Sequence, residues 1–244
     1  MNEVEKTYIS PLLGVDGKIK IPTYAKQVKI DVGLSYSAPN SKKWIKHTED
    51  RHIFSFEPQK QLNPFDLGPK SKSLREPVVF GDRYTYLKCG LDDLEEGCVK
   101  DMYISGEDVG RSSIYKPLWN NFQFKGMQEV DLIPFKLFLE HFPWDRFEFI
   151  EQLKTDTQGN DLRILQNAGD YIERFAYIDV ESTCYFDSDG VGEYEYFPSK
   201  EETMNYLYSR GFEVIKIANE IDQTYFNFKK YEHLRDELNY IIEM

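Results

Sequence analysis

Residues 27–41 read QVKIDVGLSYSAPNS, and the predicted fold follows from this stretch. Its first part alternates apolar and polar side chains and is rich in β-branched residues, which predicts a strand at Gln27–Gly33. Residues Ser37–Ser41 offer hydroxyl and amide side chains that favour the first position of a helix, and residues 42–45 continue that helix. A strand, a turn with a glycine and a helix therefore follow one another, as in the first unit of an α/β sheet.

The rest of the chain alternates strands and helices in the same way. Pro58 ends a strand at His52–Phe56, because proline cannot donate to a sheet and restricts the residue before it. Residues 106–126 are predicted to form a long irregular loop, which in a compact domain is usually functional or mobile. Further strands are predicted at 84–88, 98–105, 149–156, 175–180, 212–217 and 223–228, and helices at 132–141, 160–168 and 200–209, with a C-terminal amphipathic helix along Tyr231, Leu234, Leu238 and Ile241.

Repeated strand–helix units predict an α/β fold with a mostly parallel, doubly wound sheet. The connection Ala218–Asp222 is too short for a helical crossover, so the last two strands should form an antiparallel hairpin. This is the arrangement of Rossmann-like class I methyltransferases, in which ligands bind outside the carboxyl ends of the strands. No linker or repeat divides residues 1–244, so we expect one domain, with residues 1–26 as an N-terminal extension that acts as a lid or a substrate-side segment.

Composition excludes several classes of protein. The 244 residues are 41% hydrophobic and 15% aromatic, which is typical of a globular chain with a packed core. The net charge of −12 would repel nucleic acid. Apolar stretches are too short to cross a membrane, and the first residues do not resemble a secretory signal. The three cysteines lack CxxC spacing, which argues against disulfides and a structural zinc site. We therefore expect a cytoplasmic protein without nucleic-acid or membrane partners.

Four carboxylates fall at or just beyond predicted strand ends. They are Asp31, Glu57, Asp156 and Glu181. If their strands are parallel neighbours, all four converge on one edge of the sheet. Any single one is equally well explained as an acid that caps a helix.

The first turn indicates which nucleotide-like cofactor fits. The turn after Gly33 lacks the GxGxxG spacing that accommodates a pyrophosphate. S-adenosylmethionine has no phosphate, so it needs fewer glycines and can be held by a carboxylate and by hydroxyls such as that of Ser37. Glu57, about 25 residues after Asp31, stands where an acid binds ribose hydroxyls in nucleotide-binding folds.

Three stretches together resemble the FkbM family of methyltransferases. They read IDVGLSYSAPNS at 30–41, FSFEP at 54–58 and LKTDTQGNDLRIL at 153–165, and NAG follows at 167–169. The resemblance implies a Rossmann-like fold, S-adenosylmethionine as the methyl donor and O-methylation, often of sugars or hydroxylated natural products. It runs in order from about Gln27 to Glu181 and more loosely to Phe226.

The resemblance also implies roles for single residues. Asp31 and Gly33 would line the methionine end of the cofactor, Glu57 would hold the ribose, and Asp156 would face the transferred methyl group. The turn Gly90-Leu91-Asp92 would lie near the adenine. The first turn has fewer glycines than the family pattern, which leaves open which of Ser35, Ser37 and Asn40 contacts the cofactor.

Methyl transfer to an alcohol requires alignment and a base that takes the proton. Asp156 is the first candidate for the base and Glu181 the second. His141 is a distant third, since a histidine at a helix end also favours the helix dipole. Alternatively, Asp156 and Glu181 could hold Mg²⁺, which we do not expect, and no His/Cys cluster suggests a soft-ligand metal.

Residues 110–119 read GRSSIYKPLW and combine hydroxyls, bases and aromatic rings. Ser112, Ser113, Tyr115 and Trp119 are candidates for binding a small, ring-shaped or glycan acceptor. Tyr115 and Trp119 would equally well pin a long loop to the core. Two competing functions remain open: a nicotinamide-dependent sugar oxidoreductase, and a non-catalytic binding protein with a methyltransferase fold.

Overall fold

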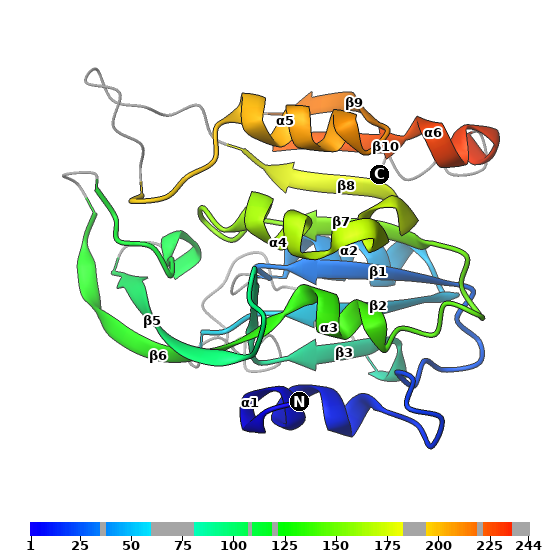
Figure 1. Ribbon diagram of the computed structural model, residues 1–244, viewed down its shortest axis with the longest axis horizontal. Helices are drawn as coiled ribbons and strands as arrows, with labels where there is room; N and C mark the ends of the chain where they lie inside the picture. Colours follow the sequence, from blue (N-terminus) through cyan, green and yellow to red (C-terminus); the bar gives the residue numbers. More distant parts are fainter. Residues whose placement is uncertain are drawn as a thin grey trace.

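The computed structural model describes residues 1–34, 38–59, 81–106, 109–118, 122–182, 194–218 and 222–235 (Figure 1). Within these residues the helices are α1 (Glu3–Ile9), α2 (Pro39–His47), α3 (Phe135–Glu140), α4 (Asp161–Asn167), α5 (Lys200–Ser209) and α6 (Phe228–Tyr231). The strands are β1 (Gln27–Val32), β2 (Arg51–Phe56), β3 (Tyr84–Leu87), β4 (Gly90–Asp92), β5 (Cys98–Ser105), β6 (Phe124–Pro134), β7 (Ile150–Thr155), β8 (Phe175–Glu181), β9 (Phe212–Ala218) and β10 (Asp222–Asn227).

The main sheet is mostly parallel. Its strand order in the described part of the chain is β3-β2-β1-β7-β8-β10-β9. The strands β3, β2, β1, β7 and β8 run parallel to their neighbours, and β10 runs antiparallel to both β8 and β9. The predicted mixed α/β class with a large parallel sheet is therefore confirmed.

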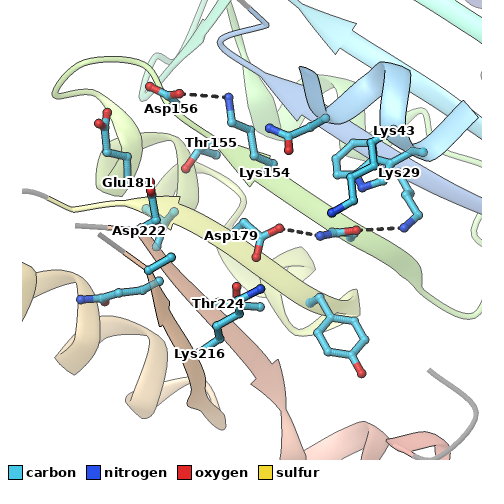
Figure 2. A pocket seen from close by; sticks show the side chains of 17 residues that line it. Lys29, Lys43, Lys154, Thr155, Asp156, Asp179, Glu181, Lys216, Asp222 and Thr224 are labelled. Carbon is cyan, nitrogen blue, oxygen red and sulfur yellow. Dashed lines mark hydrogen bonds and ion pairs between the residues drawn. The ribbon is translucent and has the colours of Figure 1, made fainter. Parts of the chain in front are cut away.

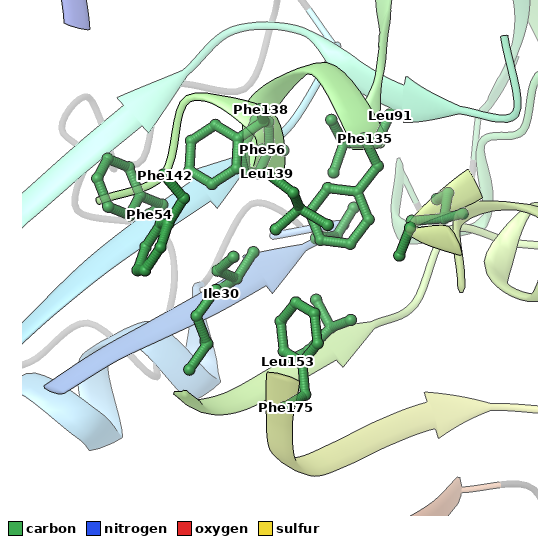
Figure 3. Close-up of a cluster of buried hydrophobic side chains, with 14 of the residues drawn as sticks. Ile30, Phe54, Phe56, Leu91, Phe135, Phe138, Leu139, Phe142, Leu153 and Phe175 are labelled. Carbon is green, nitrogen blue, oxygen red and sulfur yellow. The ribbon is translucent and has the colours of Figure 1, made fainter. Parts of the chain in front are cut away.

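One face of this sheet carries the hydrophobic core (Figure 3). Side chains alternate along a strand, so Ile30 of β1 and Leu153 of β7 point to the same face. They pack with Phe135 and Phe138 of α3 and with Ile164 of α4, all fully buried. Helices α3, α4 and α5 cover this face (Figure 1).

The opposite face carries a row of polar side chains across the strands. Lys154 of β7 pairs in register with Asp31 of β1 on one side and with Asp179 of β8 on the other. Asp31 pairs in turn with Ser55, and Asp179 with Thr224 of β10. Trp44 and Ile45 of α2 pack on this face against Ile53. Burying a polar side chain in a sheet costs free energy unless it is hydrogen-bonded or paired with a charge. A row of such residues is therefore a candidate for a functional site.

Two predictions about the middle of the chain were wrong. Residues Leu132–Pro134 end β6, and the helix predicted from Leu132 begins only at Phe135, because Pro134 stands in extended backbone just before it. The predicted loop 106–126 likewise ends early, since β6 begins at Phe124. Strands β4, β6 and β5 form a second, three-stranded sheet, in which β5 and β6 make the long curved ribbon beside the main sheet (Figure 1).

The N-terminal segment is tied into the core. Ile9, Ile19 and Ala25 are buried with the main cluster, and the Tyr8 hydroxyl donates to Asp131 of β6 at 2.5 Å. Helix α1 packs against β6 and is drawn at one edge of the molecule in Figure 1. Residues 1–26 therefore contribute to the core.

In the described part of the chain, no helix has the length and apolar character needed to span a bilayer.

Candidate functional site

The structure places the four strand-end carboxylates along one edge of the sheet. Glu57 follows β2, Asp31 is the residue before the end of β1, Asp156 follows β7, and Glu181 ends β8. These strands are parallel neighbours, and the Asp156 N–H donates to the Val32 carbonyl at 3.1 Å, which aligns the ends of β7 and β1. The edge is thus the place where ligands bind in open α/β sheets.

Asp31 stabilises the start of helix α2. The helix is preceded by Ala38, whose φ of 44° is left-handed and whose side chain cannot cap, contrary to the prediction of a polar cap. One Asp31 oxygen, Oδ2, instead accepts from the Ser41 N–H at 3.1 Å and from the Ser41 hydroxyl at 2.6 Å. Its other oxygen, Oδ1, is buried without a hydrogen-bond partner in the described residues. Burial raises the pKa of Asp31, against the opposing charge of Lys154 and the bonds from Ser41.

Gly33 makes room for the neighbouring strand. Its φ is 74°, and a Cβ at this position would lie 1.7 Å from the Asp156 carbonyl oxygen. The sequence suggested that this glycine admits a ligand. In the structure its lack of a side chain lets the turn after β1 close against the turn after β7.

Lys154 joins these two turns, and the sequence interpretation did not assign it a role. Its ammonium donates to the Gly33 carbonyl at 2.8 Å and lies 3.3 Å from Asp156 Oδ2 and 3.7 Å from Asp31 Oδ1. Burial alone would lower the pKa of Lys154, but the charges of Asp156 and Asp31 outweigh it and raise the pKa. The lysine is therefore a permanent cation between the two carboxylates.

Asp156 and Glu181 form a pair of neighbouring carboxyl groups at the ends of β7 and β8. The amide of Gln158 bridges them, because its Nε2 donates to Asp156 Oδ1 at 2.9 Å and to Glu181 Oε2 at 2.7 Å. For Glu181, burial and then the charge of Asp156 raise the pKa well above its usual range. For Asp156, burial works against ionisation, but the charge of Lys154, the neighbouring Glu181 carboxyl and the bond from Gln158 prevail and lower the pKa. The two shifts run in opposite directions, which favours a proton on Glu181 and a charge on Asp156.

A third acid, Asp161, lies behind this pair at the start of α4. It accepts from the Thr157 N–H at 3.1 Å and is almost completely buried. Burial, followed by the charge of Asp156, raises the pKa of Asp161 to about 6. The sequence did not single it out, although it lies within the Leu153–Leu165 motif.

A pocket of about 350 Å³ opens beside the carboxyl pair (Figure 2). Asp156 and Glu181 lie at one end and Lys29 and Lys43 at the other, with Asp179 between them. Within the floor, Lys29 donates to Gln152 at 2.9 Å, and the Gln152 amide donates to Asp179 at 2.5 Å. The walls come from both sides of the polar row, and they include Asn40 and Trp44 of α2 and Asp222 and Thr224 of β10.

The donors around the carboxyl pair do not suit Mg²⁺. The carboxyl oxygens that a cation would need already face positive or N–H groups. These are the ammonium of Lys154 and the amide N–H group of Gln158. In the part of the chain that the structure describes, no group of three or more His, Cys, Asp or Glu side chains is arranged for a metal. The pair is built for hydrogen bonding.

His141 is not part of this site, and its prediction as a base was wrong. Its Nδ1 lies 2.8 Å from the Gly17 carbonyl oxygen, and its own carbonyl accepts from the Ile19 N–H. These segments precede β1 and β7, so His141 lies near the amino ends of the strands. Helix α3 points its C-terminus away from the edge where the carboxylates gather.

The residues predicted to hold the ribose and adenine lie on the β2 side. Glu57 is buried, and its Oε1 accepts from the Gln59 N–H at 3.0 Å. Gly90 and Leu91 do not form the predicted turn but belong to β4, which pairs with β6. A Cβ on Gly90 would meet Leu132 at 2.6 Å and Pro58 at 3.4 Å, so this glycine brings β4 close to the residue after Glu57.

The serines predicted to bind the acceptor are engaged in contacts within the fold. Ser112 Oγ accepts from the Ser105 N–H, and Ser113 Oγ donates to the Gln158 carbonyl at 2.7 Å. The Tyr115 hydroxyl donates to Asn160 at 2.9 Å. Ser113 and Tyr115 therefore hold the segment 109–118 against the turn that follows β7, and Ser112 ties the segment to β5. Ser35, Ser37 and Trp119 lie outside the described residues.

The chain is similar to known proteins of one family. The family model described as methyltransferase FkbM domain matches residues 31–214, which begins at Asp31 and includes the carboxyl pair. A comparison with curated proteins found no match. Among solved structures, an FkbM methyltransferase from Methylobacillus flagellatus KT is similar, with a TM-score of 0.45 and 13% identity. The match covers 90% of this chain but 48% of that one, so the present chain spans about half the length of that relative. Since the family model matches most of the chain, including the turn after β1 and the carboxyl pair after β7 and β8, the protein belongs to the FkbM methyltransferase family.

Proposed function

We propose that this protein is an S-adenosylmethionine-dependent O-methyltransferase and that its acceptor, a small hydroxylated or sugar-like molecule, lies in the pocket beside Asp156 and Glu181. The observation that carries this proposal is the carboxyl pair itself. It offers an ionised Asp156 at the edge of the sheet, where 39% of its side chain is exposed, next to a protonated Glu181.

The residues at the end of β1 fit the amino-acid end of the cofactor. Asp31 Oδ1 is a buried acceptor without a hydrogen-bond partner in the described residues, which suits an ammonium group. Glu57, at the end of the adjacent strand, suits a pair of ribose hydroxyls, and Asn40 of α2 lines the pocket near the same edge. When bound, S-adenosylmethionine supplies a methyl group that its sulfonium already activates.

The chain itself has two tasks in the reaction. The polar walls of the pocket orient the acceptor hydroxyl, and Asp156 accepts its proton as the oxygen attacks. A general base of this kind typically contributes about 10² to 10⁴-fold to the rate. Lys154 keeps Asp156 ionised until the acceptor arrives, and the Gln158 amide holds Asp156 beside Glu181.

Aromatic and polar groups in the pocket favour a sugar-like acceptor. Asp179, Gln152 and Thr224 offer hydrogen-bond donors and acceptors on the sheet face, and the largely buried Trp44 borders them. Polar groups of this kind meet the hydroxyls of a sugar-like ring, while the apolar border excludes water. The net charge of −12 supports a small-molecule or glycan partner over nucleic acid.

Binding of the product cofactor tests the proposal. S-adenosylhomocysteine should raise the melting temperature, because it binds the folded state and not the unfolded state. At about 100 times its Kd, such a ligand adds about 2.7 kcal/mol to the free energy of unfolding. NAD should have no effect. Stabilisation by NAD and none by S-adenosylhomocysteine would favour an oxidoreductase, and stabilisation by neither would favour a binding protein without this cofactor.

Variants at the two ends of the site separate binding from chemistry. Glu57→Ala should weaken S-adenosylhomocysteine by about 1.5–3 kcal/mol in calorimetry, the range for a hydrogen bond to a charged group. Asp156→Asn should bind the cofactor within a few-fold of wild type while kcat for methylation of a sugar acceptor falls by roughly 10² or more. Turnover of Asp156→Asn within about threefold of wild type would remove Asp156 from the mechanism.

A further inference from the structure

The turn that follows β7 contains a residue in an unfavourable backbone conformation. Gln158 has a φ of 57°, which is left-handed and rare for a residue with a side chain. Such positions persist only where the surroundings hold them, and they gather at functional sites. The next residue, Gly159, also has a positive φ of 113°, and a Cβ there would lie 2.7 Å from the Tyr196 carbonyl oxygen. The turn is thus confined on the side of Tyr196.

Two other segments hold Gln158 in place. The Ser113 hydroxyl donates to its backbone carbonyl at 2.7 Å. The Tyr194 hydroxyl lies 3.3 Å from its side-chain oxygen, Oε1, and 2.8 Å from the Arg111 carbonyl. Since Oε1 faces the Tyr194 hydroxyl, the amide nitrogen of Gln158 faces the opposite way, toward the carboxyl pair.

That nitrogen donates to one oxygen of each carboxyl group, at 2.9 Å to Asp156 and 2.7 Å to Glu181. We infer that Gln158 is a positioning residue of the methyl-transfer site, whose clamped amide fixes Asp156 and Glu181 relative to each other and favours the ionised form of Asp156. This inference rests on the proposed function for its purpose, but the geometry belongs to the protein alone. Gln158 acts through the two carboxyls and need not touch the acceptor.

The amide has a definite electrostatic effect on the pair. A donor hydrogen bond stabilises the ionised form of a carboxylate, and the bond from Gln158 helps to lower the pKa of Asp156. The other groups around the pair are Lys154 from β7, Asp161 from α4, Asp31 from β1 and Asp222 from β10. Substitution of Gln158 leaves all of these in place, so a change in titration reports on the amide.

Carbon-13 NMR of the protein without ligand tests the inference. Side-chain carboxyl signals of Asp and Glu are followed from pH 3 to 10, and Asp156→Asn and Glu181→Gln assign the two signals of interest. In Gln158→Gly, we expect the midpoint of Asp156 to rise by roughly 0.5–1 unit, because one charge-assisted hydrogen bond is lost from a partly exposed carboxylate. The melting temperature should stay equal or rise, because glycine adopts the left-handed turn without strain.

Two further variants keep the test decisive. Gln158→Met retains the length but removes the donor without adding a charge, so it should also raise the midpoint of Asp156, and it serves if the glycine variant does not fold. Gln166→Met, on the exposed side of α4, removes an amide away from the pair and should leave both midpoints within about 0.2 units. Unchanged midpoints in Gln158→Gly and Gln158→Met would overturn the inference and leave Gln158 with a structural role only.

A failure of the role of Gln158 can be distinguished from a failure of the proposed function. If S-adenosylhomocysteine does not bind but the midpoint of Asp156 moves in Gln158→Gly, the amide positions the pair in a protein with another activity. If the cofactor binds and the midpoints do not move, the methyltransferase proposal stands and the role of Gln158 is wrong.

Discussion

At the scale of single residues, Lys154 links the two carboxylates at the ends of β1 and β7. It is the cation between the buried Asp31 and the partly exposed Asp156, and it also holds the Gly33 carbonyl. Lys154→Met removes the charge while keeping most of the volume, and it leaves Asp31 buried without a counter-ion. We expect a loss of about 3–5 kcal/mol in the free energy of unfolding, measured with urea, as for other broken buried pairs.

A matched control for Lys154 is Lys136, whose ammonium lies 4.0 Å from Glu140 on the surface of α3. Lys136→Met should change the free energy of unfolding by no more than about 0.5 kcal/mol, because exposed ion pairs contribute little. Equal losses in the two variants would mean that Lys154 has no special place in the network.

Asp161 gives the protein a measurable dependence on pH. Its pKa is about 6 in the folded state and near 3.8 when unfolded. Between these values the folded state binds more protons, so the free energy of unfolding falls as pH rises from about 4 to about 6. This contribution should amount to about 3 kcal/mol and be absent from Asp161→Asn, whose amide oxygen still accepts from Thr157. Urea unfolding at pH 4 and pH 7 checks it, and equal pH dependence in both proteins would contradict the assignment.

At the scale of elements, the contact between the turns after β1 and β7 holds the two halves of the site together. Gly33→Ala would force a Cβ against the Asp156 carbonyl and require an unfavourable φ, so we expect a loss of about 3–5 kcal/mol in stability. Gly169→Ala is the control, because Gly169 also has a positive φ, 57°, but open space around it. That substitution should lose only about 1–2 kcal/mol, the cost of the backbone conformation. Similar losses in thermal unfolding would show that the close approach of the turns is unimportant.

At the scale of the whole molecule, the net charge of −12 should make stability depend on salt. Self-repulsion of like charges destabilises a compact state, and salt screens it over about 10 Å at 0.1 M. Many of the ion pairs, such as Lys6 with Glu3, are exposed and contribute little against this. We therefore expect the melting temperature to rise between about 10 and 150 mM NaCl in differential scanning fluorimetry. A fall would mean that surface ion pairs outweigh the repulsion.

The sequence by itself determined the elements of the main sheet and their chemistry at the carboxyl edge. The strand at Gln27–Val32, the helix at Lys200–Ser209 and the stop at Gly169 follow from local periodicity and from the conformations that glycine and proline permit. Carboxylates at strand ends could be placed on one edge because parallel strands point the same way. The three-stranded sheet was harder to predict from the sequence, because β4 is short and β6 begins within a polar stretch that lacks a strong alternation of apolar and polar residues.

Only the tertiary structure decided which of these residues meet. Lys154 and Asp31 are far apart in the chain, and their register across β1 and β7 makes them an ion pair. Gln158 bridges Asp156 and Glu181 because Ser113 and Tyr194, from two other segments, fix its turn. Periodicity reports the environment of a residue along its own strand, whereas ionisation states and bridging hydrogen bonds depend on distances between strands and loops, which packing alone sets.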